Sequence, residues 1–240
     1  MPSIELDNLT VDFPIYDRAS VSLKKDLIRG LVGARIAGAE GHHFIRALDG
    51  ITLHVKEGDR IGLVGHNGAG KTTLLKAIAG IYAPSGGAVR TEGKITALID
   101  VAMGMNPEST GYENIIIRGL YLGQSMRSIK SKMDHIIAFS ELGDYINLPV
   151  RTYSAGMISR LFFSVSTAFE PDILLLDEGI IAGDQAFNEK ASRYLVQYTS
   201  KARIVMLASH SKELMHMFCN KGIRLNKGVV EAEGEIEELF

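Results

Sequence analysis

Residues 65–72 combine the residue types and the spacing that bind a phosphate. They read GHNGAGKT, which matches the pattern G-x-x-x-x-G-K-S/T between an apolar run and a helix-forming segment. The three glycines allow the backbone to curl so that successive N–H groups face the phosphates, while Lys71 reaches the β- and γ-phosphates. The Thr72 hydroxyl is placed to ligate Mg²⁺. The predicted nucleotide-binding residues here are Gly65, His66, Asn67, Gly68, Ala69, Gly70, Lys71, Thr72 and Thr73.

An acidic pair later in the chain supplies the other half of a hydrolytic site. Asp177 and Glu178 directly follow the unbroken apolar run ILLL, which is typical of a parallel strand buried on both faces. At the carboxyl end of such a strand, Asp177 can hold Mg²⁺ through water. Glu178 is placed to accept a proton from, or to orient, the water that attacks the γ-phosphate. Together the two motifs predict nucleotide chemistry, and alone they fit kinases, GTPases and many ATPases.

The elements that must position these motifs alternate between strands and helices at both ends of the chain. Apolar periodicity predicts strands at 4–11, 51–55, 60–64, 95–99, 173–176 and 203–207, and helices at about 70–80, 111–122, 125–140, 155–169, 185–199 and 211–219. A turn signal within RLNKGVVEAEG predicts a late hairpin. Because residues 105–170 are mostly helical, we expect an α/β core with an inserted helical subdomain.

Composition excludes several classes of protein. The chain is 46% hydrophobic and 22% charged, as expected for a globular protein, and its net charge of −2 gives no general reason to expect nucleic-acid binding. Its single cysteine excludes an intramolecular disulfide and fits a reducing compartment. No apolar run approaches the length of a membrane span, and the first residues lack the form of a secretory signal. A soluble, cytoplasmic protein is therefore expected.

Three further motifs narrow the choice, and with them the chain resembles the ABC ATPases. Ser-Ala-Gly at 154–156 resembles the Ser-Gly-Gly of that family's LSGGQ signature, 23 residues before the aspartate of the acidic pair. Asp184 lies six residues after the glutamate of that pair, which is the interval of the family's D-loop aspartate. His210 follows the run RIVMLAS at the place of the switch histidine that contacts the γ-phosphate. The five motifs, in this order, cover essentially the whole chain.

The match narrows to the branch of ABC subunits that export bacterial polysaccharides, including O-antigen, capsule and teichoic acid. LDEGIIAGDQAFNEK is similar to that branch's run DE-x-x-x-x-GD-x-x-F-x-x-K, and MGMNPESTGYENI resembles its G-x-G-F-x-P-E-x-T-G-x-EN-I. SLKKDLIRGL, before ALDGI, is similar to an insertion that several such subunits carry on the membrane-facing side. The resemblance therefore implies a subunit that powers export of a lipid-linked polysaccharide.

The insertion occupies residues 14–44, and the sequence permits two interpretations of it. Leucines at 23, 27 and 31 predict a short amphipathic helix, although glycines at 30, 33 and 38 weaken it. Residues 18–46 carry six Lys/Arg and two acidic residues. The segment is either a solvated helix covering a sheet edge or a basic element near a membrane surface or a membrane partner. The resemblance favours the second reading.

The sequence departs from the family pattern at several places. Tyr153, Ala155 and Met157 replace the Leu, the middle Gly and the Gln of the signature, whereas Ser154 and Gly156, the two that touch phosphate in the family, remain. The extra methyl at the middle position is tolerable if its φ angle is negative.

Two other family positions are less clear. No glutamine of the Q-loop precedes NPESTG, and Asp100 stands where this branch tends to have an acid, so it is a candidate for binding Mg²⁺ or its water. The aromatic that stacks on adenine should precede ALDGI, and Phe44 and His43 are both candidates.

The resemblance implies a P-loop NTPase core with a mostly parallel sheet, an antiparallel β subdomain and a helical subdomain at about 101–170, together one ABC ATPase domain over residues 1–240. In this family the phosphate loop and the signature of one chain do not close over the same ATP. Two copies therefore meet head to tail and bury two ATP molecules between Lys71 of one and Ser154 of the other. The implied catalytic residues are Lys71, Glu178 and His210, with Asp184 at the nucleotide and Mg²⁺ held by Thr72, Asp177 and Asp100.

Since the chain contains no membrane span, we expect the energy of ATP hydrolysis to drive a separate polytopic membrane subunit. The helical subdomain is expected to dock on that subunit at the cytoplasmic face of the inner membrane. Some exporters of this branch carry a C-terminal carbohydrate-recognition domain, and the sequence, which ends at Phe240, leads us to expect none here. Two alternatives stay open: the ATPase subunit of another ABC transporter, for a drug or a solute, and a non-transport ABC ATPase in translation or DNA repair.

Overall fold

The computed structural model describes residues 1–15, 35–37, 43–100, 104–177 and 185–239. The chain forms two compact units, one made of residues 1–93 with 204–240 and the other of residues 94–203. Within the described residues, none of the helices has both the length and the apolar character that a bilayer crossing needs.

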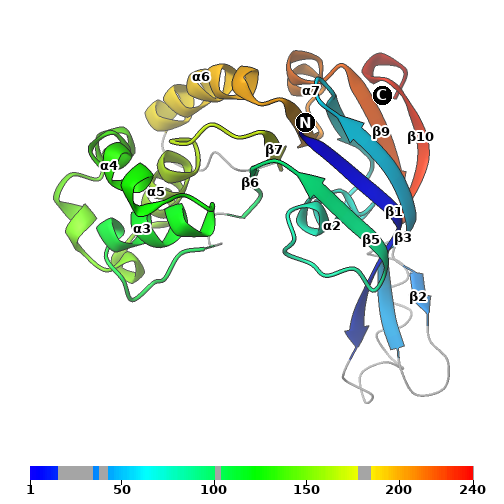
Figure 1. The fold of residues 1–240 in the computed structure, drawn as a ribbon, viewed down its shortest axis with the longest axis horizontal. Helices are drawn as coiled ribbons and strands as arrows, with labels where there is room; N and C mark the ends of the chain where they lie inside the picture. The colour runs from blue at the N-terminus through cyan, green and yellow to red at the C-terminus, as the bar shows by residue number, and fades with distance from the viewer. Residues whose placement is uncertain (16–34, 38–42, 101–103, 178–184, 240) are drawn as a thin grey trace. The chain divides into compact units, whose positions relative to one another are not determined.

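The first unit contains an antiparallel sheet in the order β2-β3-β1-β5. Its strands are β1 (Ser3–Ile15), β2 (Arg35–Ala37), β3 (His43–Lys56) and β5 (Gly86–Glu92). The side chains of Ile4, Leu6, Leu9 and Val11 in β1 are buried. They alternate with more exposed residues within each half of the strand, and an irregularity at Asn8, whose φ angle is 49°, shifts the alternation by one residue between the halves. Beyond its pairing with β5, β1 continues beside β3 toward β2 (Figure 1).

The same unit contains strands in the order β10-β9-β4-β8. Strand β4 (Arg60–Val64) pairs in parallel with β8 (Ile204–Ala208) and β9 (Lys221–Asn226), and β10 (Val229–Glu235) returns antiparallel to β9. Helix α2 (Lys71–Ile78) follows β4, α7 (Lys212–Phe218) follows β8, and the 3₁₀ turn η3 (Ile236–Leu239) follows β10. The predicted late hairpin is confirmed, and its turn residues Lys227 and Gly228 have φ angles of 48° and 81°.

The second unit joins a parallel strand pair to helices. Strands β6 (Ile95–Leu98) and β7 (Ile173–Leu176) pair in register. The helices are α3 (Gly111–Tyr121), α4 (Met126–Ser140), α5 (Ala155–Ser166) and α6 (Gln185–Lys201), with 3₁₀ turns η1 (Gly143–Asn147) and η2 (Val150–Thr152). Helices α3, α4 and α5 share a buried core that includes Ile115, Ile129, Ile136 and Leu161. An aromatic cluster of Phe139, Phe163, Phe187 and Tyr194 joins α4, α5 and α6.

All the predicted helices outside 14–44 are present with ends within a few residues, but the prediction of the strands needs correction. Strands β1 and β3 are longer than expected, β5 was not predicted, and both ends of the segment 14–44 are strand. The helix predicted from the leucines at 23, 27 and 31 lies outside the described residues. The sheet extends because β1 and β3 continue their ladder to Ile15 and His43, and local periodicity does not reveal that pairing.

Candidate nucleotide-binding site

The GHNGAGKT loop lies between the end of β4 and the start of α2, as predicted. Gly68 and Gly70 have φ angles of 80° and 108°, in the region that side chains rarely adopt. At Gly65 a Cβ atom would come within 2.4 Å of the Leu225 carbonyl oxygen. The glycines are thus required by the backbone conformation and by the close approach of β9. The loop delivers Lys71, Thr72 and Thr73 to the first turn of α2.

The loop curls around the Lys71 ammonium, which is largely buried. Lys71 Nζ donates hydrogen bonds to the carbonyl oxygens of Gly65 at 2.6 Å and His66 at 3.2 Å. The same atom lies 3.4 Å from His210 Nε2. Two residues that are 139 positions apart in the chain are therefore brought together, as the switch-histidine prediction requires.

His210 is held by a second residue of the loop. It follows β8, and its Nε2 lies 2.8 Å from Asn67 Oδ1, so the tautomer with a proton on Nε2 donates to that oxygen. A polar cluster at the phosphate loop is thus formed by Lys71, His210 and Asn67. A phosphate entering the loop would offer acceptors to the Lys71 ammonium in place of the two backbone carbonyls.

The two aromatic candidates near the start of β3 lie in different surroundings. Phe44 pairs with Pro14 of β1, and the Arg46 guanidinium stacks 5.3 Å from its ring centre while binding both carboxylate oxygens of Asp12. The side chain of His43 is not among those described. Because side chains alternate along a strand, Phe13 points to the opposite face of the sheet from Phe44.

Phe13 contacts a residue just beyond α2. Its ring packs edge-on against Tyr82, with centroids 5.1 Å apart, and the Lys76 ammonium of α2 lies 5.6 Å from the Tyr82 ring centre. Phe13 therefore lies on the face of the sheet that contacts α2, the helix into which the phosphate loop leads. Phe13 was not singled out from the sequence. The signal was present, since it belongs to the alternating run of β1, but the strand was expected to end at residue 11.

The signature-like residues begin α5 in the second unit. Ser154 is the N-cap, and its hydroxyl oxygen accepts a hydrogen bond from the Met157 N–H at 3.2 Å. Ala155 is the first helical residue, so its φ angle is negative and its methyl group is accommodated. Ser154 and Gly156 border a cavity of about 370 Å³. The exposed serine hydroxyl can thus cap the helix and remain accessible.

The strand pair of the second unit carries the predicted metal-binding acids. Asp177 follows β7, and its N–H donates to the Leu98 carbonyl oxygen of β6 at 3.0 Å. Asp100 follows β6 and favours the charged form of Arg118, a side chain only 1% exposed. Burial lowers the pKa of Arg118 to about 10, and the negative charge of Asp100 opposes that shift. Glu178 and Asp184 lie outside the described residues.

The residues of Thr-Gly-x-Glu-Asn, at 110–114, have structural roles at the start of α3. Thr110 and Glu113 form a reciprocal capping box at the start of α3. Asn114 is fully buried; its Oδ1 accepts from the Asn106 N–H at 2.6 Å, and its Nδ2 donates to three backbone carbonyls. The motif therefore fixes residues 106–110 against the first turn of α3.

Comparison with known proteins decides the family. A model of the ABC transporter family matches residues 48–180, which include the phosphate loop, the signature and the acidic pair. The chain belongs to the ABC transporter family. It has the fold of that family's P-loop ATPases: the post-hydrolysis dimer of the ATP-binding cassette MJ0796 bound to ADP and Pi gives a TM-score of 0.68 at 21% identity, covering 97% of this chain and 98% of that one. An ATP-binding subunit of an ABC transporter gives 0.70 at 19% identity, covering 98% and 90%.

Curated relatives of this ABC protein include proteins of polysaccharide export. The O-antigen export system ATP-binding protein RfbE of Yersinia enterocolitica is 44% identical, with 97% of this chain and 98% of that protein covered. The protein RfbB of Myxococcus xanthus, of the same description, is 39% identical over 91% of this chain and 49% of its own length. The teichoic acids export ATP-binding protein TagH of Bacillus cereus is 34% identical over 99% and 41%. The ABC protein thus spans nearly all of one relative and less than half of the other two.

Proposed function

We propose that this ABC protein is the ATP-binding and ATP-hydrolysing subunit of an exporter of a polysaccharide or lipid-linked glycan of the O-antigen type. The observation that carries the proposal is the 44% identity to an O-antigen export ATP-binding protein along nearly the whole of both chains. The intact phosphate loop and the proximity of His210 to Lys71 support ATP hydrolysis as the source of energy.

When the nucleotide binds, Lys71 and His210 each replace a contact within the protein with a contact to phosphate. The Lys71 ammonium leaves the carbonyls of Gly65 and His66 for the β- and γ-phosphate oxygens, and the backbone N–H groups of residues 65–73 surround the phosphates. His210 leaves Asn67 Oδ1 and contacts the γ-phosphate. Glu178 orients or deprotonates the attacking water.

The donor set fits Mg²⁺. The Thr72 hydroxyl lies in the first turn of α2, and the Asp177 carboxylate follows β7, so both offer the hard oxygen ligands that this ion prefers. Asp100, two residues beyond β6, would add a second carboxylate. When bound, the ion neutralises charge that develops on the phosphates.

Two copies of the cassette close over two ATP molecules. The Ser154 hydroxyl and the Gly156 N–H of one copy contact the γ-phosphate held by Lys71 of the other, with Asp184 at the same boundary. A head-to-tail arrangement of this kind is a self-complementary, two-fold interface. Hydrolysis removes the phosphate that both copies hold, so the dimer opens and ATP acts as a switch.

The work is delivered to a separate polytopic membrane subunit, which places the cassette at the cytoplasmic face of the inner membrane as a peripheral protein. We propose that residues 1–240 act as one ABC ATPase domain, that the helical subdomain at about 101–170 docks on the membrane subunit, and that the basic segment 14–44 lies on the membrane side. At about 1 kcal/mol per basic residue near anionic lipid, that segment alone would give only a weak, salt-sensitive attachment.

Reconstitution tests this function. The cassette and the membrane subunit encoded with it would be placed in liposomes, and ATP hydrolysis measured with and without candidate lipid-linked glycans. We expect one glycan class to stimulate hydrolysis and be translocated, and Lys71→Ala to abolish both effects. Stimulation by a drug or a small solute, with no response to any glycan, would support another kind of ABC transporter instead.

A further inference from the structure

A carboxylate at the end of α4 joins cations from two other helices. Glu141 directly follows α4 with a left-handed backbone, at a φ angle of 55°. Its Oε1 accepts from Lys190 Nζ of α6 at 2.5 Å, and its Oε2 lies 3.9 Å from Arg160 Nη1 of α5. Lys190 Nζ also donates to the Phe139 carbonyl oxygen at 3.0 Å. Three helices of the second unit therefore meet at one side chain.

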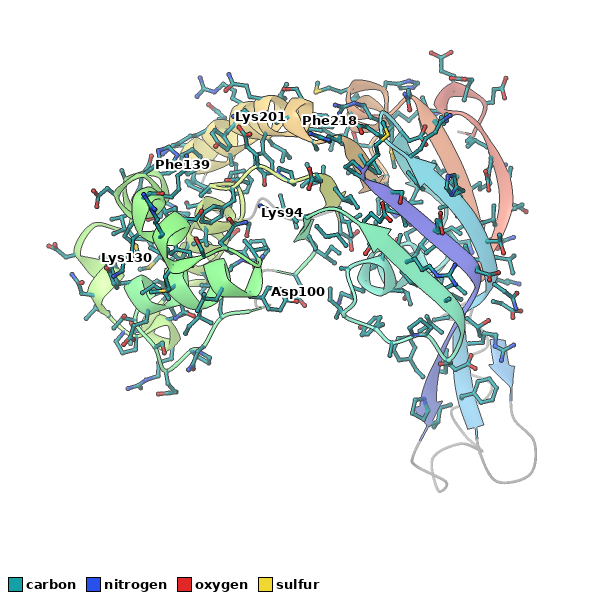
Figure 2. The ribbon with its side chains drawn as sticks, in the orientation of Figure 1. Lys94, Asp100, Lys130, Phe139, Lys201 and Phe218 are labelled. Atoms are coloured by element: carbon teal, nitrogen blue, oxygen red, sulfur yellow. The ribbon has the colours of Figure 1, made fainter. Side chains whose placement is uncertain are left out.

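Aromatic rings restrict the two cations. Phe139 lies on α4 (Figure 2). The Lys190 ammonium lies 4.3 Å from its ring centre and 5.9 Å from that of Phe187 on α6. The Arg160 guanidinium lies 5.2 Å from the Phe187 ring, which is itself 1% exposed. An ordinary surface ion pair contributes little to stability because forming it costs the conformational entropy of two long side chains. Here the rings already order both side chains, and they add cation–π attraction.

The cluster connects two places that the nucleotide chemistry uses. Arg160 is six residues after Ser154 on the signature helix, and Glu141, Ser154 and Arg160 border the same cavity of about 370 Å³. Lys190 lies near the start of α6, whose first residue, Gln185, directly follows Asp184 in the sequence. The Glu141 carboxylate thus ties the helix that begins at the signature to the helix that follows the D-loop aspartate.

We propose that Glu141 is a positioning residue: through Arg160 and Lys190 it holds α5 and α6 in one arrangement, so that the signature serine and the start of α6 are presented together to a second copy. The inference rests on the proposed ATP-driven dimer. Glu141 acts only by orienting the two helices and contacts no nucleotide. Loss of its charge therefore slows turnover and leaves the affinity of the isolated chain for ATP unchanged.

Matched variants of the full-length chain test this role. Glu141→Gln keeps the size and removes the charge, and Lys190→Arg keeps the cation. The control is Lys201→Met, which breaks the Lys201–Glu170 pair of 2.9 Å at the other end of α6. For each variant, kcat and KM for Mg-ATP are measured, with the dissociation constant of ATP and the hydrogen-exchange rates of the amides at 155–160 and 186–190 in the nucleotide-free protein.

We expect Glu141→Gln to lower kcat about tenfold, to leave the ATP dissociation constant within twofold, and to speed exchange at both helix starts about tenfold. Lys190→Arg should retain most of the activity, and Lys201→Met should match the wild type. Unchanged kcat and exchange in Glu141→Gln would overturn the positioning role while leaving the proposed function intact. The role would also be overturned if Glu141→Gln lost as much affinity for ATP as it lost in kcat and Lys190→Arg lost activity to the same extent. A wild type that does not hydrolyse Mg-ATP would contradict the proposed function, and the exchange rates would still judge the role of Glu141.

Discussion

Ser154 and Ser125 cap two helices of the same unit with nearly the same geometry, which separates a structural role from a catalytic one. Each serine hydroxyl accepts a hydrogen bond from the N–H three residues later, at 3.2 Å in both cases, and both residues are exposed. Only Ser154 belongs to the signature. We therefore predict that Ser154→Ala and Ser125→Ala have the same effect on stability and different effects on ATP hydrolysis.

The expected sizes follow from the contacts that each variant loses. Removing a serine N-cap costs about 1 kcal/mol of stability, which lowers the melting temperature of a chain of this length by roughly 2–4 °C. In the proposed closed dimer, Ser154 would also donate to a phosphate oxygen, and a hydrogen bond to a charged group contributes about 1.5–3 kcal/mol. The additional loss should lower kcat about 10- to 150-fold in Ser154→Ala alone.

The assay is steady-state release of phosphate from Mg-ATP, with thermal unfolding of each variant measured in the same buffer. Ser154→Arg, which places a bulky cation at the interface, should abolish activity while the isolated chain still binds ATP. Equal kcat values of Ser154→Ala and Ser125→Ala, within a factor of two, would refute a catalytic contribution of the Ser154 hydroxyl. In that case the signature serine would only cap α5.

Three other predictions concern the nucleotide site and its support. Lys71→Ala should weaken ATP binding at least tenfold, measured by fluorescence titration, and wild-type affinity would count against its role. We predict that Phe13, on the face of the sheet that contacts α2, stacks on adenine in place of Phe44. Base stacking contributes about 1–3 kcal/mol, so Phe13→Ala should raise the ATP dissociation constant roughly 5- to 150-fold and Phe44→Ala should leave it nearly unchanged; the reverse result would assign adenine to Phe44. Burial acts to raise the pKa of Asp59, but hydrogen bonds from the Lys221 ammonium and a backbone N–H outweigh it and lower that pKa. The stabilisation is therefore present at neutral pH and is lost as pH falls below about 4, so the free energy of unfolding should fall more steeply with acid in the wild type than in Asp59→Asn; equal slopes in denaturant titrations would contradict this assignment.

The parts of the site that the sequence predicts well are those encoded by contiguous residues. The phosphate loop needs its glycines for local reasons, because left-handed φ angles at Gly68 and Gly70 belong to the loop itself. The end of a buried apolar strand locates Asp177 in the same way. An N-cap serine before an apolar helix likewise predicts the start of α5 at Ala155.

Features that depend on pairing between distant segments could not be predicted in this way. Strand β5 reads GGAVRTE, a glycine-rich run with few apolar residues, and its place at the edge of the sheet comes from its ladder with β1. Phe13 faces α2 only because β1 continues to Ile15 beside β3. The Glu141 cluster gathers residues from α4, α5 and α6, and each of its charged members would read as an ordinary surface residue in its own helix. Arg118 is buried against Phe162, 3.9 Å from its ring centre, and no local pattern predicts an arginine there.

The most direct test of the account is the mass of Glu178→Gln in the presence of Mg-ATP. Removing the carboxylate stops hydrolysis without removing any proposed contact between the copies, so ATP should hold the closed dimer. Size-exclusion chromatography with light scattering should then show a species of twice the 26.2 kDa chain, dependent on ATP and absent from the double variant with Lys71→Ala. A variant that binds Mg-ATP and yet remains a monomer of 26.2 kDa would contradict the central claim, that ATP joins the phosphate loop of one copy to the signature of another.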